Sequence, residues 1–230
     1  MDELCKKIID RISSDRSICL MLNEILNCAN VYLFGGAVRN YLDDDFENVR
    51  DLDFVVDFKK NSHSIDRFFI KSTKFKKNIF GGYKILSNDI CIDMWEMKDT
   101  WAFRENKICR SVYNLTKSVF LNIDGIVYSM NNGNYINDCN QKYFEIRKKN
   151  ILDTVLEENP CVELNLLRAL VLCKKYNMEF SDDLKKIFNI YSYSENFMDY
   201  LMYLQLKHYG KQVLSSQCMK ELMIKKLNII

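Results

Sequence analysis

The segment formed by residues 31–56 constrains the fold of this chain more than any other part of the sequence. It reads VYLFGGAVRNYLDDDFENVRDLDFVV. An apolar run stops at Gly35 and Gly36, a short helical pattern follows, and a second apolar run opens with Asp51 and Asp53. Because side chains alternate between the two faces of a strand, we expect Asp51 and Asp53 to lie on the same face.

The two halves of this segment indicate a chemistry. Two carboxylates on one edge repel each other unless a cation lies between them, and a divalent metal is a common partner. Glycines between a strand and a helix let backbone N–H groups approach a phosphate, and the helix N-terminus adds the positive end of its dipole. The combination predicts a site for a metal and a phosphorylated ligand. The alternative interpretation is a turn followed by a surface acidic pair.

The pattern GGAVRNYL…RDLDFVV resembles the head-domain motif of the class II tRNA nucleotidyltransferases and bacterial poly(A) polymerases, within the DNA polymerase β-like nucleotidyltransferase superfamily. The family motif runs Gly-Gly-x-Val-Arg-Asp-x-Leu and then, after a loop, Asp-x-Asp. The resemblance implies that Gly35 and Gly36 hold the triphosphate with Arg39 nearby. It also implies that Asp51 and Asp53 bind catalytic Mg²⁺.

A third carboxylate is expected on a neighbouring strand. Asp93 lies within the apolar run 90–95, and a buried strand does not carry an aspartate without a partner. The superfamily commonly has a third metal-binding acid on such a strand, and Asp93 is the candidate. Glu96, on the opposite face, is the alternative.

The sequence departs from the family at several positions. Asn40 replaces the usual Asp of the motif, and the loop before Asp51 is slightly longer. The family also has an Arg-Arg-Asp motif before the equivalent of residues 122–128, but residues 118–120 are Ser-Val-Phe here. Read from chemistry alone, Asp124 and Gly125 indicate a tight hairpin turn between two apolar runs.

A second match lies in a long amphipathic run after Pro160. Leu-Arg-Ala at residues 167–169 matches a helix that selects the incoming base in the family, so Arg168 is a candidate nucleotide ligand, with a structural salt bridge as the alternative. The positions that read the base in the family hold other residues here: Cys161, Val162, Asn165 and Val171. We therefore expect a nucleotide choice broader than, or different from, strict addition of C and A.

Composition limits the other function classes. The net charge of +2 over 230 residues predicts that RNA contacts come from local patches and not from the whole surface. Nine scattered cysteines without a C-x-x-C pair, and only two histidines, argue against zinc and favour a reducing cytoplasm. No apolar stretch is long enough to span a bilayer, so no membrane partner is expected.

The expected architecture is α+β. A polymerase β-like head, with a mixed sheet flanked by helices, is expected over residues 1–152, and a helical neck over residues 153–230. Amphipathic patterns predict helices at 2–12 and 16–29. The glycine pair at 81–82 predicts the turn of a β-hairpin.

The predicted function is transfer of a nucleoside monophosphate from an NTP such as ATP to an RNA 3′ hydroxyl, with tRNA as one acceptor. Two Mg²⁺ ions are expected, with Mn²⁺ as a substitute. Full-length class II enzymes continue into body and tail domains that grip tRNA, and the sequence is expected to lack them. Two alternatives follow: a stand-alone toxin or defence enzyme that modifies a protein or small-molecule hydroxyl, and a non-catalytic nucleotide-binding regulatory module.

Overall fold

The computed structural model describes residues 2–60, 63–69, 75–78, 81–87 and 90–227. The chain divides into two compact units. The first unit comprises residues 1–118 and 124–143, and the second comprises residues 119–123 and 144–230. The domain boundary expected between residues 152 and 153 stays a prediction.

The first unit is built on a mixed sheet. Its seven described strands follow the order β3-β4-β5-β2-β1-β6-β7. β2 and β5 pair in parallel, and the other neighbours pair antiparallel. The strands are β1 (Ala29–Phe34), β2 (Asp51–Phe58), β3 (Phe75–Lys77), β4 (Tyr83–Ser87), β5 (Ile90–Glu96), β6 (Val127–Ser129) and β7 (Asn134–Tyr135).

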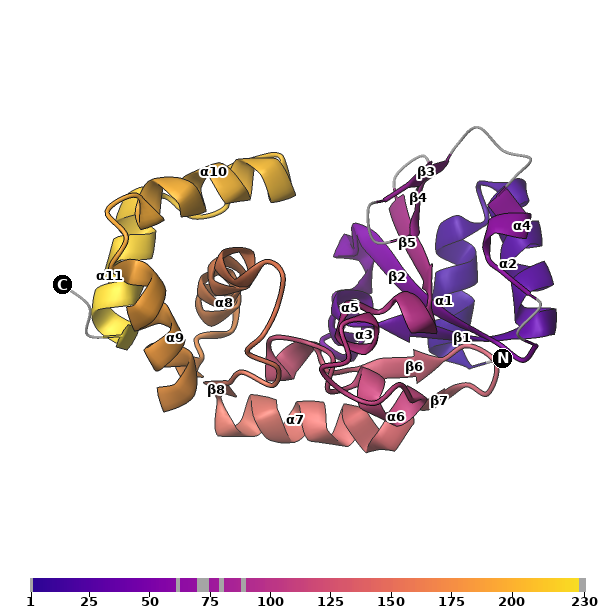
Figure 1. The fold of residues 1–230 in the computed structure, drawn as a ribbon, viewed down its shortest axis with the longest axis horizontal. Coiled ribbons are helices and arrows are strands. Elements are labelled where there is room, and N and C mark those ends of the chain that lie inside the picture. The colour runs from indigo at the N-terminus through magenta and orange to yellow at the C-terminus, as the bar shows by residue number, and fades with distance from the viewer. Residues whose placement is uncertain (1, 61–62, 70–74, 79–80, 88–89, 228–230) are drawn as a thin grey trace. The chain divides into compact units, whose positions relative to one another are not determined.

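Helices surround this sheet in Figure 1. The α-helices of the first unit are α1 (Glu3–Ile12), α2 (Arg16–Cys28), α3 (Gly36–Leu42), α4 (Asp66–Phe69), α5 (Trp101–Arg104) and α6 (Val112–Leu115). The 3₁₀ turns are η1 (Phe46–Asn48), η2 (Met97–Asp99), η3 (Asn122–Asp124) and η4 (Ile136–Asp138). α7 (Cys139–Lys149) runs from the first unit into the second. Asp2 and Asp15 cap α1 and α2 by accepting hydrogen bonds from first-turn N–H groups, so both helices predicted from the sequence are confirmed.

One face of the sheet is fully buried. Leu52, Phe54 and Val56 of β2 are each 0% exposed, and Ile92 and Met94 of β5 are almost as deeply buried. α2 packs against β1, and Figure 1 shows α1, α2 and α4 gathered on one side of the sheet. The alternation of Leu52, Phe54 and Val56 with the aspartates therefore sends the acidic side chains to the other face.

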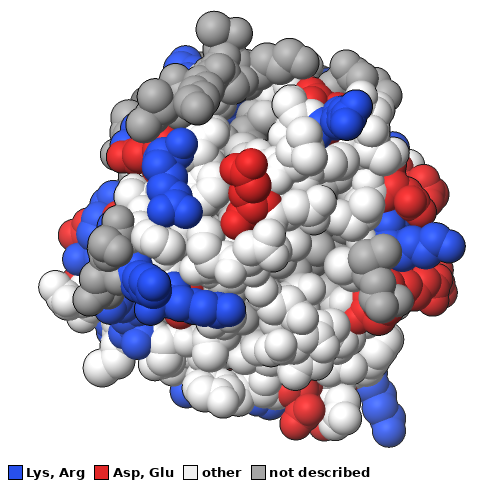
Figure 2. Space-filling model, turned by 90° about the vertical axis from the view of Figure 1, so that its right-hand side faces the viewer, with Lys and Arg blue, Asp and Glu red and all other residues white. Residues whose placement is uncertain are grey.

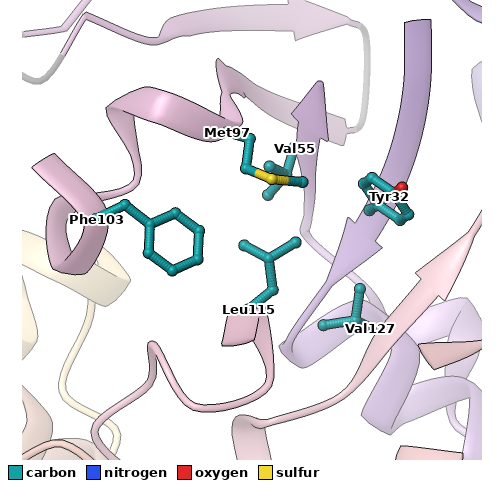
Figure 3. Close-up of a cluster of buried hydrophobic side chains, with 6 residues drawn as sticks. All are labelled: Tyr32, Val55, Met97, Phe103, Leu115 and Val127. Carbon is teal, nitrogen blue, oxygen red and sulfur yellow. The ribbon is translucent and has the colours of Figure 1, made fainter. Parts of the chain in front are cut away.

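A smaller apolar cluster covers part of that other face (Figure 3). We call it the Val55 cluster, and its buried members are Tyr32, Val55, Met97, Phe103, Leu115 and Val127. The segments η2, α5 and α6 supply Met97, Phe103 and Leu115. On β2 the cluster uses Val55, whereas Asp51 and Asp53, earlier on the same face, are half-buried.

Two turn predictions have different outcomes. β3 and β4 form the predicted antiparallel hairpin, but its last pair is Lys77 with Tyr83, so the loop is longer than the predicted two-residue glycine turn. Gly81 of this loop has a φ of +91° that favours glycine. Residues 79–80 of its loop lie outside the described residues. The hairpin turn predicted at Asp124 and Gly125 is wrong, because residues 122–124 form η3 and β6 pairs with β1 and β7 instead.

The second unit is mostly helical. Its helices are α8 (Val162–Tyr176), α9 (Asp182–Ser192), α10 (Phe197–Tyr209) and α11 (Ser216–Leu227), and a short parallel pair joins β8 (Ile151–Leu152) to β9 (Glu179–Phe180). Gln205, at 0% exposure, bonds the backbone of Val213 and Leu214 and so ties α10 to the loop before α11. Among the helices that the structure describes, none has the length and apolar character needed to cross a membrane. The predicted α+β class with a helical C-terminal part is confirmed.

Candidate functional site

Three aspartates are brought to one face of the sheet by the pairing of β2 with β5. In this parallel pair Asp53 lies opposite Asp93, and Asp51 lies opposite Cys91. Paired positions point to the same side of a sheet, and neighbouring strands are about 4.8 Å apart. The register therefore places the three predicted carboxylates on one half-buried face. Their role as metal ligands and catalytic residues stays a prediction.

The neighbouring strand β4 adds a lysine to this face. Lys84 lies opposite Asp93, and its Nζ donates a hydrogen bond to Asp93 Oδ2 at 2.7 Å. The same ammonium lies 3.3 Å from Cys91 Sγ. Burial alone would lower the pKa of Lys84, but the bonds to Asp93 and Cys91 outweigh it and raise that pKa above its usual range. Burial also raises the pKa of the Cys91 thiol.

The identity of these side chains fits a divalent metal. Carboxylate oxygens are the ligands that Mg²⁺ prefers, and the register gathers three of them at adjacent positions. Among the described residues, however, no group of three Asp, Glu, His or Cys side chains is arranged to hold an ion. The Asp93 carboxylate pairs with Lys84, and the Asp51 carboxylate pairs with Arg50 at 3.2 Å.

Glu96, the alternative third carboxylate, has a different position. It is 7% exposed and occupies the sheet face opposite Asp93. Its Oε1 accepts hydrogen bonds from Ser64 Oγ and the Ile65 N–H, both at 3.0 Å, and Lys98 pairs with its Oε2. This carboxylate therefore anchors the segment before α4, on the sheet face away from Asp51 and Asp53, and the choice of Asp93 as the third metal ligand stays a prediction.

The glycine bend lies at the start of α3, as expected. Gly35 is the N-cap residue with φ +69° and ψ −126°, a conformation open to glycine. Its N–H donates to the Ile126 carbonyl at 2.9 Å, so this amide is already used within the fold. The first helical bond runs from the Arg39 N–H to the Gly35 carbonyl, which leaves the N–H groups of residues 36–38 ahead of it. Gly36, and not Gly35, thus begins the stretch of amides that could meet a phosphate.

Arg39 lies near Gly36, as expected, and it also has a partner that the sequence did not indicate. Its guanidinium forms an ion pair with Asp124, and the two side chains are only 11% and 7% exposed. The pair joins α3 to the segment before β6. Sequence reasoning missed Asp124 because an Asp-Gly pair between apolar runs is also typical of a hairpin turn. A role for Arg39 in phosphate binding stays a prediction beside this structural contact.

The second unit carries the remaining predicted residue. Arg168 is half-buried on α8, and its contact with a nucleotide stays a prediction. Nearby on the same helix, the Asn165 side chain donates to Asn159 Oδ1 and the Cys161 carbonyl. Asn165 is thus engaged within its own unit, at a position that reads the base in the family.

Comparisons with known proteins support the fold. No protein-family model matches the chain, and no curated protein does. A solved tRNA-processing enzyme, in apo form I, matches with a TM-score of 0.60 and 19% identity over 95% of this chain and 56% of that chain. A CCA-adding enzyme with CTP matches with a TM-score of 0.60 and 16% identity, covering 97% and 54% of the two chains.

A Thermotoga maritima CCA-adding enzyme complexed with tRNA gives a TM-score of 0.59 and 17% identity, covering 97% of this chain and 54% of that one. At such identities the likeness shows the fold. The resemblance to tRNA nucleotidyltransferases indicated by the glycine and aspartate motifs is confirmed at that level. The chain spans about half the length of the solved structures that it matches.

Proposed function

We propose that this chain is a metal-dependent nucleotidyltransferase that transfers a nucleoside monophosphate from an NTP to a hydroxyl acceptor. The observation that carries the proposal is the register that sets Asp51 and Asp53 of β2 beside Asp93 of β5 on one half-buried face. The glycine bend at the start of α3 and the fold shared with CCA-adding enzymes support it.

The chemistry assigned to these residues is an in-line displacement. The acceptor hydroxyl oxygen bonds to the α-phosphorus, the bond from that phosphorus to the bridging oxygen breaks, and pyrophosphate leaves. The hydroxyl proton passes to a carboxylate, for which Asp93 is the candidate. Asp51, Asp53 and Asp93 would hold two Mg²⁺ or Mn²⁺ ions. Bound there, the ions would lower the pKa of the acceptor hydroxyl and stabilise charge on the leaving phosphates.

The acceptor is proposed to be an RNA 3′ hydroxyl, with a tRNA-like molecule first among the candidates. Solved proteins with this fold include a tRNA nucleotidyltransferase complexed with a primer tRNA and an ATP analog, and a CCA-adding enzyme with ATP. The surface charge is mixed: Figure 2 shows acidic and basic side chains interspersed on one face. With a net charge of +2, RNA binding would depend on local contacts and weaken as salt rises.

The decisive experiment identifies what becomes labelled. The purified protein is incubated with Mg²⁺, each α-³²P-labelled NTP, and either total RNA or an RNA-free mixture of proteins and small metabolites. Label in RNA that is lost on alkaline hydrolysis supports the proposal. Label confined to protein or to a small molecule would show that the acceptor is not RNA but would support nucleotidyl transfer. Absence of transfer to any acceptor would contradict the proposed function.

Substitution of a carboxylate tests the site within the same assay. Asp53→Asn keeps the shape of the side chain but removes a charged oxygen ligand, and we expect it to reduce transfer by at least roughly 100-fold, the scale set by losing transition-state charge stabilisation. Asp183→Asn on α9 is the matched control, because Asp183 is an exposed partner of Lys186. Full activity of Asp53→Asn would show that the reaction does not use this face.

A further inference from the structure

Lys84, which lies beside the three aspartates, has no role in the reaction described so far. Register pairs Asp53 with Asp93 and Asp93 with Lys84, so the three side chains occupy successive positions across β2, β5 and β4. Lys84 is 45% exposed and Asp93 is 21% exposed. The pair is therefore partly shielded from water, and it lies beside the carboxylates assigned to the metal.

Basic side chains pair with the carboxylates of this face: Lys84 with Asp93 at 2.7 Å, and Arg50 with Asp51 at 3.2 Å. The backbone register sets three aspartates side by side, yet no described group of three potential ligands is arranged around an ion. Lys84 Nζ holds Asp93 Oδ2 at 2.7 Å, on the β4 side of β5 and away from β2. An ammonium and a divalent cation compete for the same carboxylate oxygens, and they also repel each other.

We propose that Lys84 is a positioning residue that holds Asp93 in the metal-free protein and thereby sets the concentration of divalent ion at which the site fills. Binding of the ion requires Asp93 to turn from Lys84 toward Asp53. The lysine has a flexible four-carbon stem, so its ammonium can leave the carboxylate without a backbone change. The inference rests on the proposed function, because it assumes that these carboxylates bind the ion.

Binding of Mn²⁺ without nucleotide tests the inference directly. Free Mn²⁺ is measured by electron paramagnetic resonance while the protein is titrated, so no turnover is required. Lys84→Met removes the competing ammonium and keeps most of the length of the side chain, and we expect roughly three- to tenfold tighter Mn²⁺ binding, the range that a partly shielded, charge-assisted ion pair contributes. The Mg²⁺ concentration that supports half-maximal transfer should fall in parallel.

Two further variants separate direct competition from general charge. Lys84→Arg keeps a cation against Asp93, so it should bind Mn²⁺ no more tightly than the wild type. Lys77→Met changes the net charge equally within the same β3–β4 hairpin, but Lys77 pairs with Asp66 at 2.9 Å. We expect Lys77→Met to stay within about twofold of the wild-type affinity, since exposed charges are strongly screened.

The outcomes are distinguishable. If Asp53→Asn abolishes Mn²⁺ binding while Lys84→Met leaves the affinity unchanged or weaker, the role of Lys84 is overturned and the proposed function stands. If Asp53→Asn binds Mn²⁺ as well as the wild type, the ion is not held by this face, and both proposals fail. Urea unfolding of each variant shows that the compared proteins are folded.

Discussion

At the scale of single residues, the two adjacent glycines of the bend meet different constraints. Gly35 has a φ of +69°, which residues with side chains rarely adopt. There is nevertheless room for a Cβ, because its nearest neighbour, the Asp124 carbonyl oxygen, would lie 3.9 Å away. Backbone conformation and not space therefore restricts this position. Gly36 is helical, and a Cβ there would lie 3.6 Å from the guanidinium of Arg39, which is ordinary contact. The fold therefore leaves room for a side chain at Gly36, and its part in holding a triphosphate stays a prediction.

This contrast gives a prediction for two alanine variants. Gly35→Ala should destabilise the protein by about 1–3 kcal/mol, the cost of a strained non-glycine conformation. Gly36→Ala should leave stability unchanged or higher by up to about 1 kcal/mol, since alanine favours a helix over glycine. It should nevertheless weaken nucleotide binding, because the methyl group lies beside the first N–H groups of α3. Urea unfolding and titration with a fluorescent ATP analogue measure the two effects.

Stability and nucleotide binding are measured on the same variants, so a loss of folding can be separated from a loss of binding. Weaker nucleotide binding by Gly36→Ala at full stability would assign the loss to the ligand. Normal stability of Gly35→Ala would contradict the constraint inferred from its φ, and undiminished nucleotide binding by Gly36→Ala would remove the bend from the binding site.

At the scale of elements, a buried ion pair holds α3 in place. Arg39 and Asp124 are both nearly inaccessible to water and connect α3 to the segment leading into β6. The Gly35 N–H bond to the Ile126 carbonyl joins the same two segments. α3 thus begins at a fixed position relative to β1 and β6, and that position sets where its first N–H groups point.

We predict that Arg39→Met destabilises the protein by about 3 kcal/mol, because it leaves the Asp124 carboxylate buried without its charged partner. Arg104→Met is the matched control: Arg104 pairs with Glu105 at the surface, and such a pair contributes at most about 1 kcal/mol. Urea unfolding measures both. Equal stability of Arg39→Met and wild type would show that Arg39 serves a ligand more than the fold.

At the scale of the whole molecule, the chain shares its fold with about half the length of the CCA-adding enzymes that it matches, and the resemblance predicts base-reading positions in α8 and at its N-cap. Those positions hold Cys161, Val162, Asn165 and Val171. The side-chain amide of Asn165 donates hydrogen bonds to Asn159 Oδ1 and to the Cys161 carbonyl, both within its own unit. The side chains of Val162 and Val171 have no hydrogen-bonding group to read a base edge.

We expect incorporation from the four NTPs to be broader than, or different from, strict addition of C and A. The measurement is the rate of labelling of bulk RNA with each α-³²P-labelled NTP at equal concentration, followed by sequencing of the added 3′ residues. An archetypal CCA-adding enzyme serves as the control for selective addition. Clean completion of CCA ends by this protein would contradict the prediction.

Much of the fold was predictable because it rests on local patterns. Each of these features depends only on residues close together in the sequence. They are the strand, glycine bend and helix of residues 31–42, the caps of α1 and α2, and the alternation of Asp51 and Asp53 with buried residues. Period-two alternation alone places Asp51 and Asp53 on one face, since each strand position fixes the side of its neighbours.

Contacts between distant segments were decided only by the tertiary structure. The sequence indicates that Asp93 needs a partner, but the β4–β5 register determines that this partner is Lys84. From the sequence, the Asp-Gly pair at residues 124–125 is compatible with a hairpin turn. In the structure, Asp124 instead forms an ion pair with Arg39, which lies 85 residues away in the chain. Local alternation fixes the face of a side chain, whereas the groups that it meets across strands depend on pairing between segments far apart in the sequence.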